Sequence, residues 1–129
     1  MTFKLYDYVS EDGTNELRSW TLSLQKVERA KLNAKLDKLF LHGTSLRPEM
    51  LAGTGIGGLE KLRIKGPTQL RPLLCTGPIR TEDEFTLLFG ARERGDKWQP
   101  KDALQQAVDR KLKVKQNPTG HRKDHERVS

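Results

Sequence analysis

A run of positive charge in the middle of the chain is the feature with the clearest chemical potential. Residues 57–75, GGLEKLRIKGPTQLRPLLC, have the pattern of two short strands joined by a Gly-Pro turn. Between residues 61 and 80 there is no carboxylate, and all five charged side chains are cations: Lys61, Arg63, Lys65, Arg71 and Arg80. Four more cations come after the next apolar segment: Arg92, Arg94, Lys97 and Lys101.

Alternation along the first of these strands gathers three cations. Side chains of a strand point to opposite faces in turn, so Lys61, Arg63 and Lys65 are predicted to share one face with Leu59. Like charges side by side are destabilising, and solvated faces usually mix both signs. We therefore interpret the row as a surface for phosphate groups. The simpler alternative is a solvated strand face, which antiparallel sheets often have.

The totals agree with an anionic partner. The 129 residues carry a formal charge of +7, and residues 59–129 hold 16 Lys and Arg against 10 Asp and Glu, whereas residues 1–58 hold 8 against 7. Nucleic acid is the usual partner of such a chain, with an acidic protein or a membrane surface as alternatives. The length suits one domain.

The single cysteine, Cys75, excludes an intramolecular disulfide and a cysteine zinc cluster. Its apolar surroundings predict a buried, inert thiol. No apolar run approaches the roughly 20 residues of a membrane span, and the acidic N-terminal segment is unlike a signal peptide. We expect a cytoplasmic protein with no membrane partner, no metal and no cofactor.

The elements that position the cations follow from local patterns. Residues 3–8 have the pattern of a strand. Thr14 or Asn15 can cap a helix, and residues 23–42 have the pattern of a long helix that ends at Gly43. Whether residues 15–42 form two helices or one bent helix stays open. Strands are predicted at 59–65, 70–75 and 84–91, and a last helix from Pro100. The fold class is α+β: a small antiparallel sheet in the order strand, helix, helix, strand, strand, strand, helix, packed against helices.

Further expectations concern packing and the ends of elements. Pro72 within a strand predicts a bulge or an edge position. GTGIGG, residues 53–58, follows a helix and opens a strand, so we interpret it as a connector and not as a phosphate loop. The single domain is expected to span 1–115, with 116–129 a disordered polar tail. Helical spacing predicts three buried stripes, and Trp20 is expected in the first of them. They consist of Leu17, Trp20 and Leu24; of Val27, Leu32, Leu36, Leu39 and Phe40; and of Leu104, Ala107, Val108, Lys111 through its stem, and Leu112.

At these residues the chain resembles the RelE/ParE toxin superfamily, and specifically its phage-derived, HigB-like branch. The similarity covers residues 3–113 and rests on the order and spacing of several motifs. They are Gly43, Leu46, Pro48 and Leu51, the strand GLEKLR at 58–63, the turn Gly66-Pro67, Leu70-Arg71, the apolar strand 85–89, the basic segment 92–97, and Pro100 with Leu104 and Ala107.

The resemblance implies a RelE-like fold and the toxin of a type II toxin–antitoxin system. Such a toxin cuts mRNA on the ribosome without metal, and its partners are the ribosome, mRNA and a helix-turn-helix antitoxin. It implies catalytic roles for Arg63, Arg71, Lys61 and Lys97, with the two lysines as candidate bases. Lys65, Arg80, Arg92, Arg94 and Lys101 would bind nucleic acid.

Three functions stay open at this point. The family usually carries Tyr or His near the end of the last strand, where this chain has Arg92, Glu93, Arg94 and Trp98. A ParE-like inhibitor of DNA gyrase and a non-catalytic, phage-derived module that binds RNA or protein are therefore the alternatives to the endoribonuclease. Trp98 could stack on a base or lie beneath the last helix.

Overall fold

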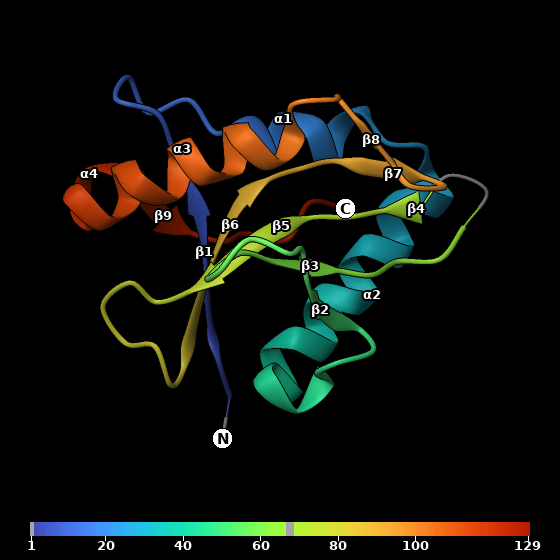
Figure 1. Ribbon diagram of the computed structural model, residues 1–129, viewed down its shortest axis with the longest axis horizontal. Helices are drawn as coiled ribbons and strands as arrows, with labels where there is room; N and C mark the ends of the chain where they lie inside the picture. Colours follow the sequence, from blue (N-terminus) through green and yellow to red (C-terminus); the bar gives the residue numbers. More distant parts are fainter. Residues whose placement is uncertain (1, 67–68) are drawn as a thin grey trace.

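The computed structural model describes residues 2–66 and 69–129, which form helices and strands in an α+β arrangement (Figure 1). The helices are α1 (Glu16–Ser23), α2 (Lys26–His42), the 3-10 turn η1 (Gly43–Leu46), α3 (Ala103–Gln116) and α4 (Pro118–His121). The strands are β1 (Lys4–Tyr8), β2 (Leu51–Gly53), β3 (Glu60–Leu62), β4 (Gln69–Leu70), β5 (Leu73–Thr76), β6 (Glu84–Phe89), β7 (Arg92–Arg94), β8 (Lys97–Gln99) and β9 (Arg122–Asp124).

Six strands form the main sheet, in the order β2-β3-β5-β6-β1-β9, and β4-β7-β8 form a second, small sheet. Four of the five strand pairs in the main sheet are antiparallel, but β1 and β6 run parallel, with Leu5 opposite Phe85. The prediction of a purely antiparallel sheet is therefore wrong at its centre. A parallel pair needs a long crossover, and here α1, α2 and the strands that follow supply it.

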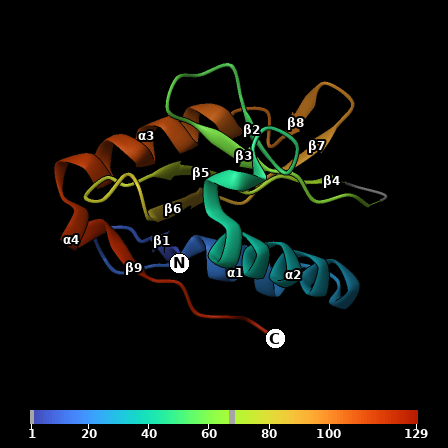
Figure 2. The same cartoon turned by 90° about the horizontal axis from the view of Figure 1, so that it is seen from below.

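Helices cover both faces of the main sheet (Figure 2). Leu32, Leu36 and Leu39 of α2 pack with Leu62 and Leu74 on one face. On the other face Ala103, Ala107 and Val114 of α3 pack with a second set of buried residues, among them Leu59, Leu73, Cys75 and Leu88. Strand β6 is buried along its whole length for this reason. The face that we expected to present cations to solvent thus lies partly under α3.

Local signals at the helix ends are confirmed. The side chain of Asn15 caps α1 by accepting from the Arg18 amide at 3.0 Å. Gly43 ends α2 with a φ of 51°, and a Cβ there would lie 2.2 Å from the Phe3 ring, so a larger residue would be both strained and obstructed. Leu24 and Gln25 interrupt the helical backbone, so α1 and α2 are two separate helices.

The expected buried stripe of α2 is only partly correct. Leu32, Leu36 and Leu39 are buried, but Val27 is 67% exposed and Phe40 43% exposed. Asn33 is buried instead. Its side-chain amide has a partner there, since it donates to the Val128 carbonyl at 2.8 Å. The stripe of α3 was also predicted too wide, since Leu112 is 56% exposed. Trp20 is partly buried against the core.

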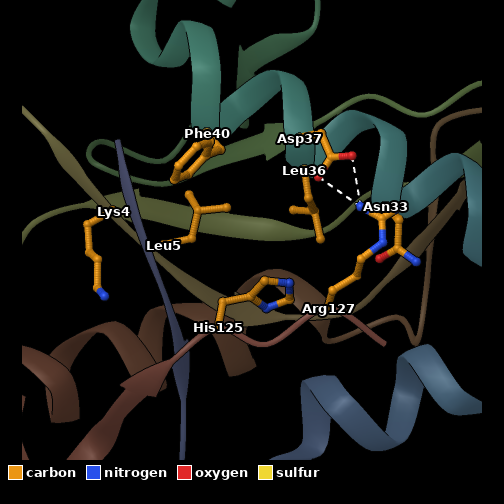
Figure 3. Close-up of a pocket in the computed structure, with 8 residues that line it drawn as sticks. All are labelled: Lys4, Leu5, Asn33, Leu36, Asp37, Phe40, His125 and Arg127. Atoms are coloured by element: carbon orange, nitrogen blue, oxygen red, sulfur yellow. Dashed lines mark hydrogen bonds and ion pairs between the residues drawn. The ribbon is translucent and has the colours of Figure 1, made fainter. Parts of the chain in front are cut away.

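The predicted disorder of the C-terminal tail is wrong for residues 118–124. They form α4 and β9, and β9 pairs antiparallel with β1, with Tyr6 opposite Asp124. The tail then crosses α2, where Val128 is buried and Arg127 forms an ion pair with Asp37 at 2.8 Å (Figure 3). The prediction was based on polar composition, but this segment is held in place by backbone pairing with β1 and by one buried valine.

The predicted irregularity at Pro72 is confirmed. The pairing of β5 with β6 shifts between Leu73 and Leu74, and the expected strand 70–75 is divided into β4 and β5. This division sends β4 to the small sheet, where it pairs with β7. The hairpin of β7 and β8 was not predicted, although its two-residue Gly95-Asp96 loop is a recognised turn signal.

Candidate functional site

A carboxylate and two cations meet where the two sheets adjoin. The Glu93 carboxylate of β7 accepts hydrogen bonds from the ammonium of Lys61 in β3, at 3.2 and 3.4 Å, and from Arg71 Nε, at 3.1 Å. The Lys61 ammonium lies 5.4 Å from the centre of the Trp98 ring of β8. We call Lys61, Arg71, Glu93 and Trp98 the Glu93 cluster.

Strand register brings these residues together. The Arg71 amide donates to the Ala91 carbonyl at 2.8 Å, and in the small sheet Glu93 lies opposite Gln69. β4 ends at Leu70 and β5 begins at Leu73, so Arg71 and Pro72 occupy the junction between the sheets. The turn at Gly95 then returns the chain and places Trp98 opposite Glu93.

The guanidinium of Arg71 is fully engaged. The residue is 5% exposed, and Nη1 donates to the carbonyls of Leu70 at 2.9 Å and Ile64 at 3.3 Å, while Nη2 donates to the side chain of Gln69. Burial lowers the pKa of Arg71, and the hydrogen bond and charge of Glu93 oppose that effect. Each arm of this side chain thus has a protein partner, and its position is fixed.

The predicted row of three cations is divided. Lys61 belongs to the Glu93 cluster, but Arg63 is exposed and donates to the Glu49 carbonyl at 3.3 Å. Arg63 and Lys65 lie with Lys31 and Lys35 of α2 around a hollow of about 650 Å³, whose other lining residues are Ala34, Glu49, Met50 and Ile64. The row separates because β3 ends at Leu62, so strict alternation stops before Arg63.

A second hollow of about 650 Å³ continues this one along α2. It shares Lys31, Ile64 and Lys65 with the first, and its further lining residues include Val27 and the ion pair of Glu28 with Arg92. We call the two hollows together the α2 groove. Burial, followed by the charges of Lys38 and Lys65, lowers the pKa of Lys35.

The other predicted site residues are dispersed. Arg92 forms two hydrogen bonds with Glu28 of α2, at 2.6 and 3.0 Å. Arg80 lies in the β5–β6 loop, at the far end of these strands from Arg71, and pairs with Asp83 at 2.7 Å. Arg94, Lys97 and Lys101 are exposed. Lys97 and Lys101 line a hollow of about 580 Å³ beside Trp98.

The structure reverses the premise that the cations lack carboxylates. Glu93, from β7, pairs with Lys61 and Arg71, and Glu28, from α2, pairs with Arg92. Asp83, from the same loop as Arg80, pairs with that residue, whereas Arg63 and Lys65 form no ion pair among the described residues. Sequence reasoning did not include Glu93 in the candidate site. Its place in RERGDKWQ, next to a hairpin turn, was the available signal.

Metal ligands and the cysteine thiol give no second candidate site among the described residues. Over residues 2–66 and 69–129, no three His, Cys, Asp or Glu side chains are grouped as metal ligands would be. Cys75 is buried as predicted, and burial raises the pKa of its thiol to about 11. Across the same ranges, none of the helices combines the length and apolar character that crossing a membrane requires.

Comparison with known proteins gives no relative. No protein-family model, no curated protein and no solved structure matches this chain. The geometry of its own residues therefore carries the functional argument.

Proposed function

We propose that this protein is the toxin of a type II toxin–antitoxin pair and that it cuts mRNA on the ribosome at the Glu93 cluster. The net charge of +7 and the motifs of residues 3–113 that resemble RelE/ParE toxins support the class. The observation that carries the assignment is the Glu93 carboxylate held between Lys61 and Arg71, with Trp98 adjacent.

This set contains the groups that metal-independent RNA cleavage requires. The ribose 2′-oxygen bonds to the adjacent phosphorus as the bond from phosphorus to the 5′-oxygen breaks, which leaves a cyclic phosphate and a 5′-hydroxyl. Glu93 accepts the proton of the 2′-hydroxyl, and the ammonium of Lys61 donates a proton to the departing 5′-oxygen. Arg71 and Lys61 stabilise the negative charge that develops on the phosphate.

Substrate entry requires an exchange of ion pairs. The side chains of Lys61, Arg71 and Glu93 are only 13%, 6% and 16% exposed, and Glu93 holds the positions that a phosphate would take. A phosphate that binds both cations releases the carboxylate, which is then free to accept a proton. Trp98, half-buried beside Lys61, offers its ring for stacking on a base.

One observation favours a second function. Because the donors of Arg71 are occupied, and Arg63 lies in the α2 groove, the two arginines to which the resemblance gives catalytic roles do not form a clamp around one phosphate. A module that binds RNA without cutting it needs no such clamp. The gyrase-inhibitor alternative likewise depends on protein binding and not on phosphate chemistry.

Primer extension on mRNA in a translating extract tests the proposal. We expect the parent to produce defined cuts, and Glu93→Gln to reduce the cleavage rate about 10²- to 10³-fold, as loss of a general base does. Glu82→Gln, an exposed carboxylate of the β5–β6 loop, is the matched control and should cut like the parent.

Two results would overturn the assignment. If folded Glu93→Gln cuts as fast as the parent, the cluster is not the cleavage site. If the parent binds RNA but never cuts, the non-catalytic module replaces the endoribonuclease, and a fall in gyrase supercoiling would instead favour the gyrase inhibitor. Expression without an antitoxin should arrest bacterial growth, and normal growth at high expression would contradict every toxin assignment.

A further inference from the structure

We infer that the α2 groove is a docking surface for an acidic amphipathic segment of a partner protein, in which carboxylates alternate with aliphatic side chains. The groove runs between α2 and the segment that follows β3, and no member of the Glu93 cluster is among its lining residues. Its occupation therefore does not require cleavage activity at that cluster.

The charge of the groove is unbalanced. Lys31, Lys35, Arg63 and Lys65 line its first hollow against one carboxylate, Glu49, and none of the four forms an ion pair in the part of the chain that the structure describes. In contrast, the cations of the Glu93 cluster are both paired. Carboxylates of a partner would complete this surface.

Lys35 shows this imbalance most clearly. Its ammonium is partly buried and lies 3.8 Å from the thioether sulfur of Met50, a weak acceptor. The neighbouring charges of Lys38 and Lys65 add to the effect of burial in lowering its pKa. An anionic group bound at this point would relieve both the repulsion and the poor solvation of the ammonium.

The groove also has an aliphatic side. Val27, Lys31, Ala34 and Lys35 lie at positions i, i+4, i+7 and i+8 of α2, so they share one face of the helix over about 12 Å. Val27 is 67% exposed, and Met50 and Ile64 line the opposite wall. The pattern of aliphatic and cationic side chains is complementary to a segment of about eight helical residues with Leu or Val on one side and Glu or Asp beside them.

Single-stranded RNA fits this groove less well. Proteins that recognise single strands stack bases on aromatic rings, and no aromatic side chain of the described residues lines either hollow. Trp98, the aromatic ring near Lys61, belongs to the Glu93 cluster and not to the groove. An acidic peptide uses both the aliphatic and the cationic side chains, whereas RNA would use the cations alone.

Fluorescence anisotropy with three labelled probes tests this inference. The first is a 14-residue peptide of Leu, Ala and Glu with its leucines at helical spacing. The second has the same glutamates with serine in place of leucine, and the third is a 14-nucleotide oligouridine. We expect the leucine peptide to bind the parent protein more tightly than the serine peptide, and more weakly as salt rises.

Matched variants locate the binding. Lys31→Ala with Lys35→Ala should weaken binding of the leucine peptide about tenfold, because two exposed ion pairs are lost. Lys113→Ala with Lys115→Ala removes the same charge from exposed positions of α3 and should change it less than twofold. Val27→Ser should weaken it about threefold, while Leu112→Ser, at an exposed aliphatic residue of α3, should not.

Several outcomes would overturn the inference. The first two are that no peptide binds, or that the leucine and serine peptides bind equally well. The third is that the double lysine variants of α2 and of α3 lose the same affinity for the leucine peptide. The fourth is that the double lysine variant of α2 loses affinity for oligouridine alone. The last of these would make the groove an RNA surface. If the double lysine variant melts early, Arg63→Ala provides the same test from the other wall.

Discussion

Glu93 Oε1 lies 3.1 Å from Arg71 Nε, at the junction between the main sheet and the small one. The same oxygen lies 3.2 Å from the ammonium of Lys61, so one carboxylate joins β3, β7 and the link between β4 and β5. Arg71 is nearly buried, and Glu93 is the carboxylate that balances its charge. The ion pair is thus structural in the absence of substrate, and any phosphate chemistry must begin by opening it.

Removing Glu93 should destabilise the protein. Glu93→Ala leaves the Arg71 guanidinium buried with backbone carbonyls and Gln69 as its remaining partners, and loss of one member of such a pair costs about 2 kcal/mol or more. Urea denaturation measures the change. Glu82→Ala, whose side chain is 70% exposed, should stay within about 0.5 kcal/mol of the parent. Equal midpoints for the two variants would mean that Arg71 does not depend on Glu93.

Local features of the fold were predictable because neighbouring residues determine them. Asn15 caps α1, Gly43 ends α2, and Pro72 divides a strand, as the sequence indicated. The parallel pairing of β1 with β6 and the strand β9 depend on contacts between distant segments, which single-sequence patterns do not reveal.

The candidate site shows the same limit. Lys61 and Glu93 are 32 residues apart, and Arg71 and Glu93 are 22 apart, so no spacing rule pairs them. The row Lys61, Arg63 and Lys65 assumed a strand that continues to residue 65, but β3 ends at Leu62. The sequence drew attention to the cations, whereas their partners and their division into two places required the three-dimensional structure.

Stability should fall in acid through the pair of Glu28 and Arg92. The hydrogen bond from Arg92 holds the pKa of Glu28 below its ordinary value, so the pair stabilises the folded state above about pH 4.3 and is lost as the pH falls through the lowered value. We expect urea midpoints measured from pH 7 to pH 3 to fall less steeply in Glu28→Gln than in the parent. Glu82→Gln is the control for general charge, and an identical acid slope in Glu28→Gln would contradict the assignment.

Cys75 should be inert while the protein is folded. With a pKa of about 11, about one thiol in a thousand is ionised at pH 8, and the residue is also 3% exposed. Iodoacetamide at pH 8 should therefore modify the native protein at least 100-fold more slowly than the protein in denaturing urea. Mass spectrometry of timed samples gives both rates, and rapid native modification would show that the core around β5 opens readily.

The C-terminal segment should stabilise the sheet by covering its β1 edge. Deletion of residues 122–129 removes β9, leaves the hydrogen-bonding groups of β1 that face β9 unpaired, and exposes the surface under Val128. An uncovered edge strand promotes pairing with other chains, so we expect a lower urea midpoint together with self-association at high concentration. Size-exclusion chromatography and urea denaturation measure the two effects.

Two point variants separate the contributions within this segment. Val128→Ser keeps β9 and removes apolar burial, so it should cost about 1 kcal/mol without self-association. His125→Ala removes the contact of Nδ1 with Asp7 at 2.7 Å and leaves that buried carboxylate with Asn15 at 2.9 Å, so it should also lower the midpoint. Glu126→Ala, an exposed neighbour, is the control. If the deletion melts like the parent and stays monomeric, the segment does not contribute to the stability of the sheet, and the contacts of β9, His125 and Val128 are too weak to matter.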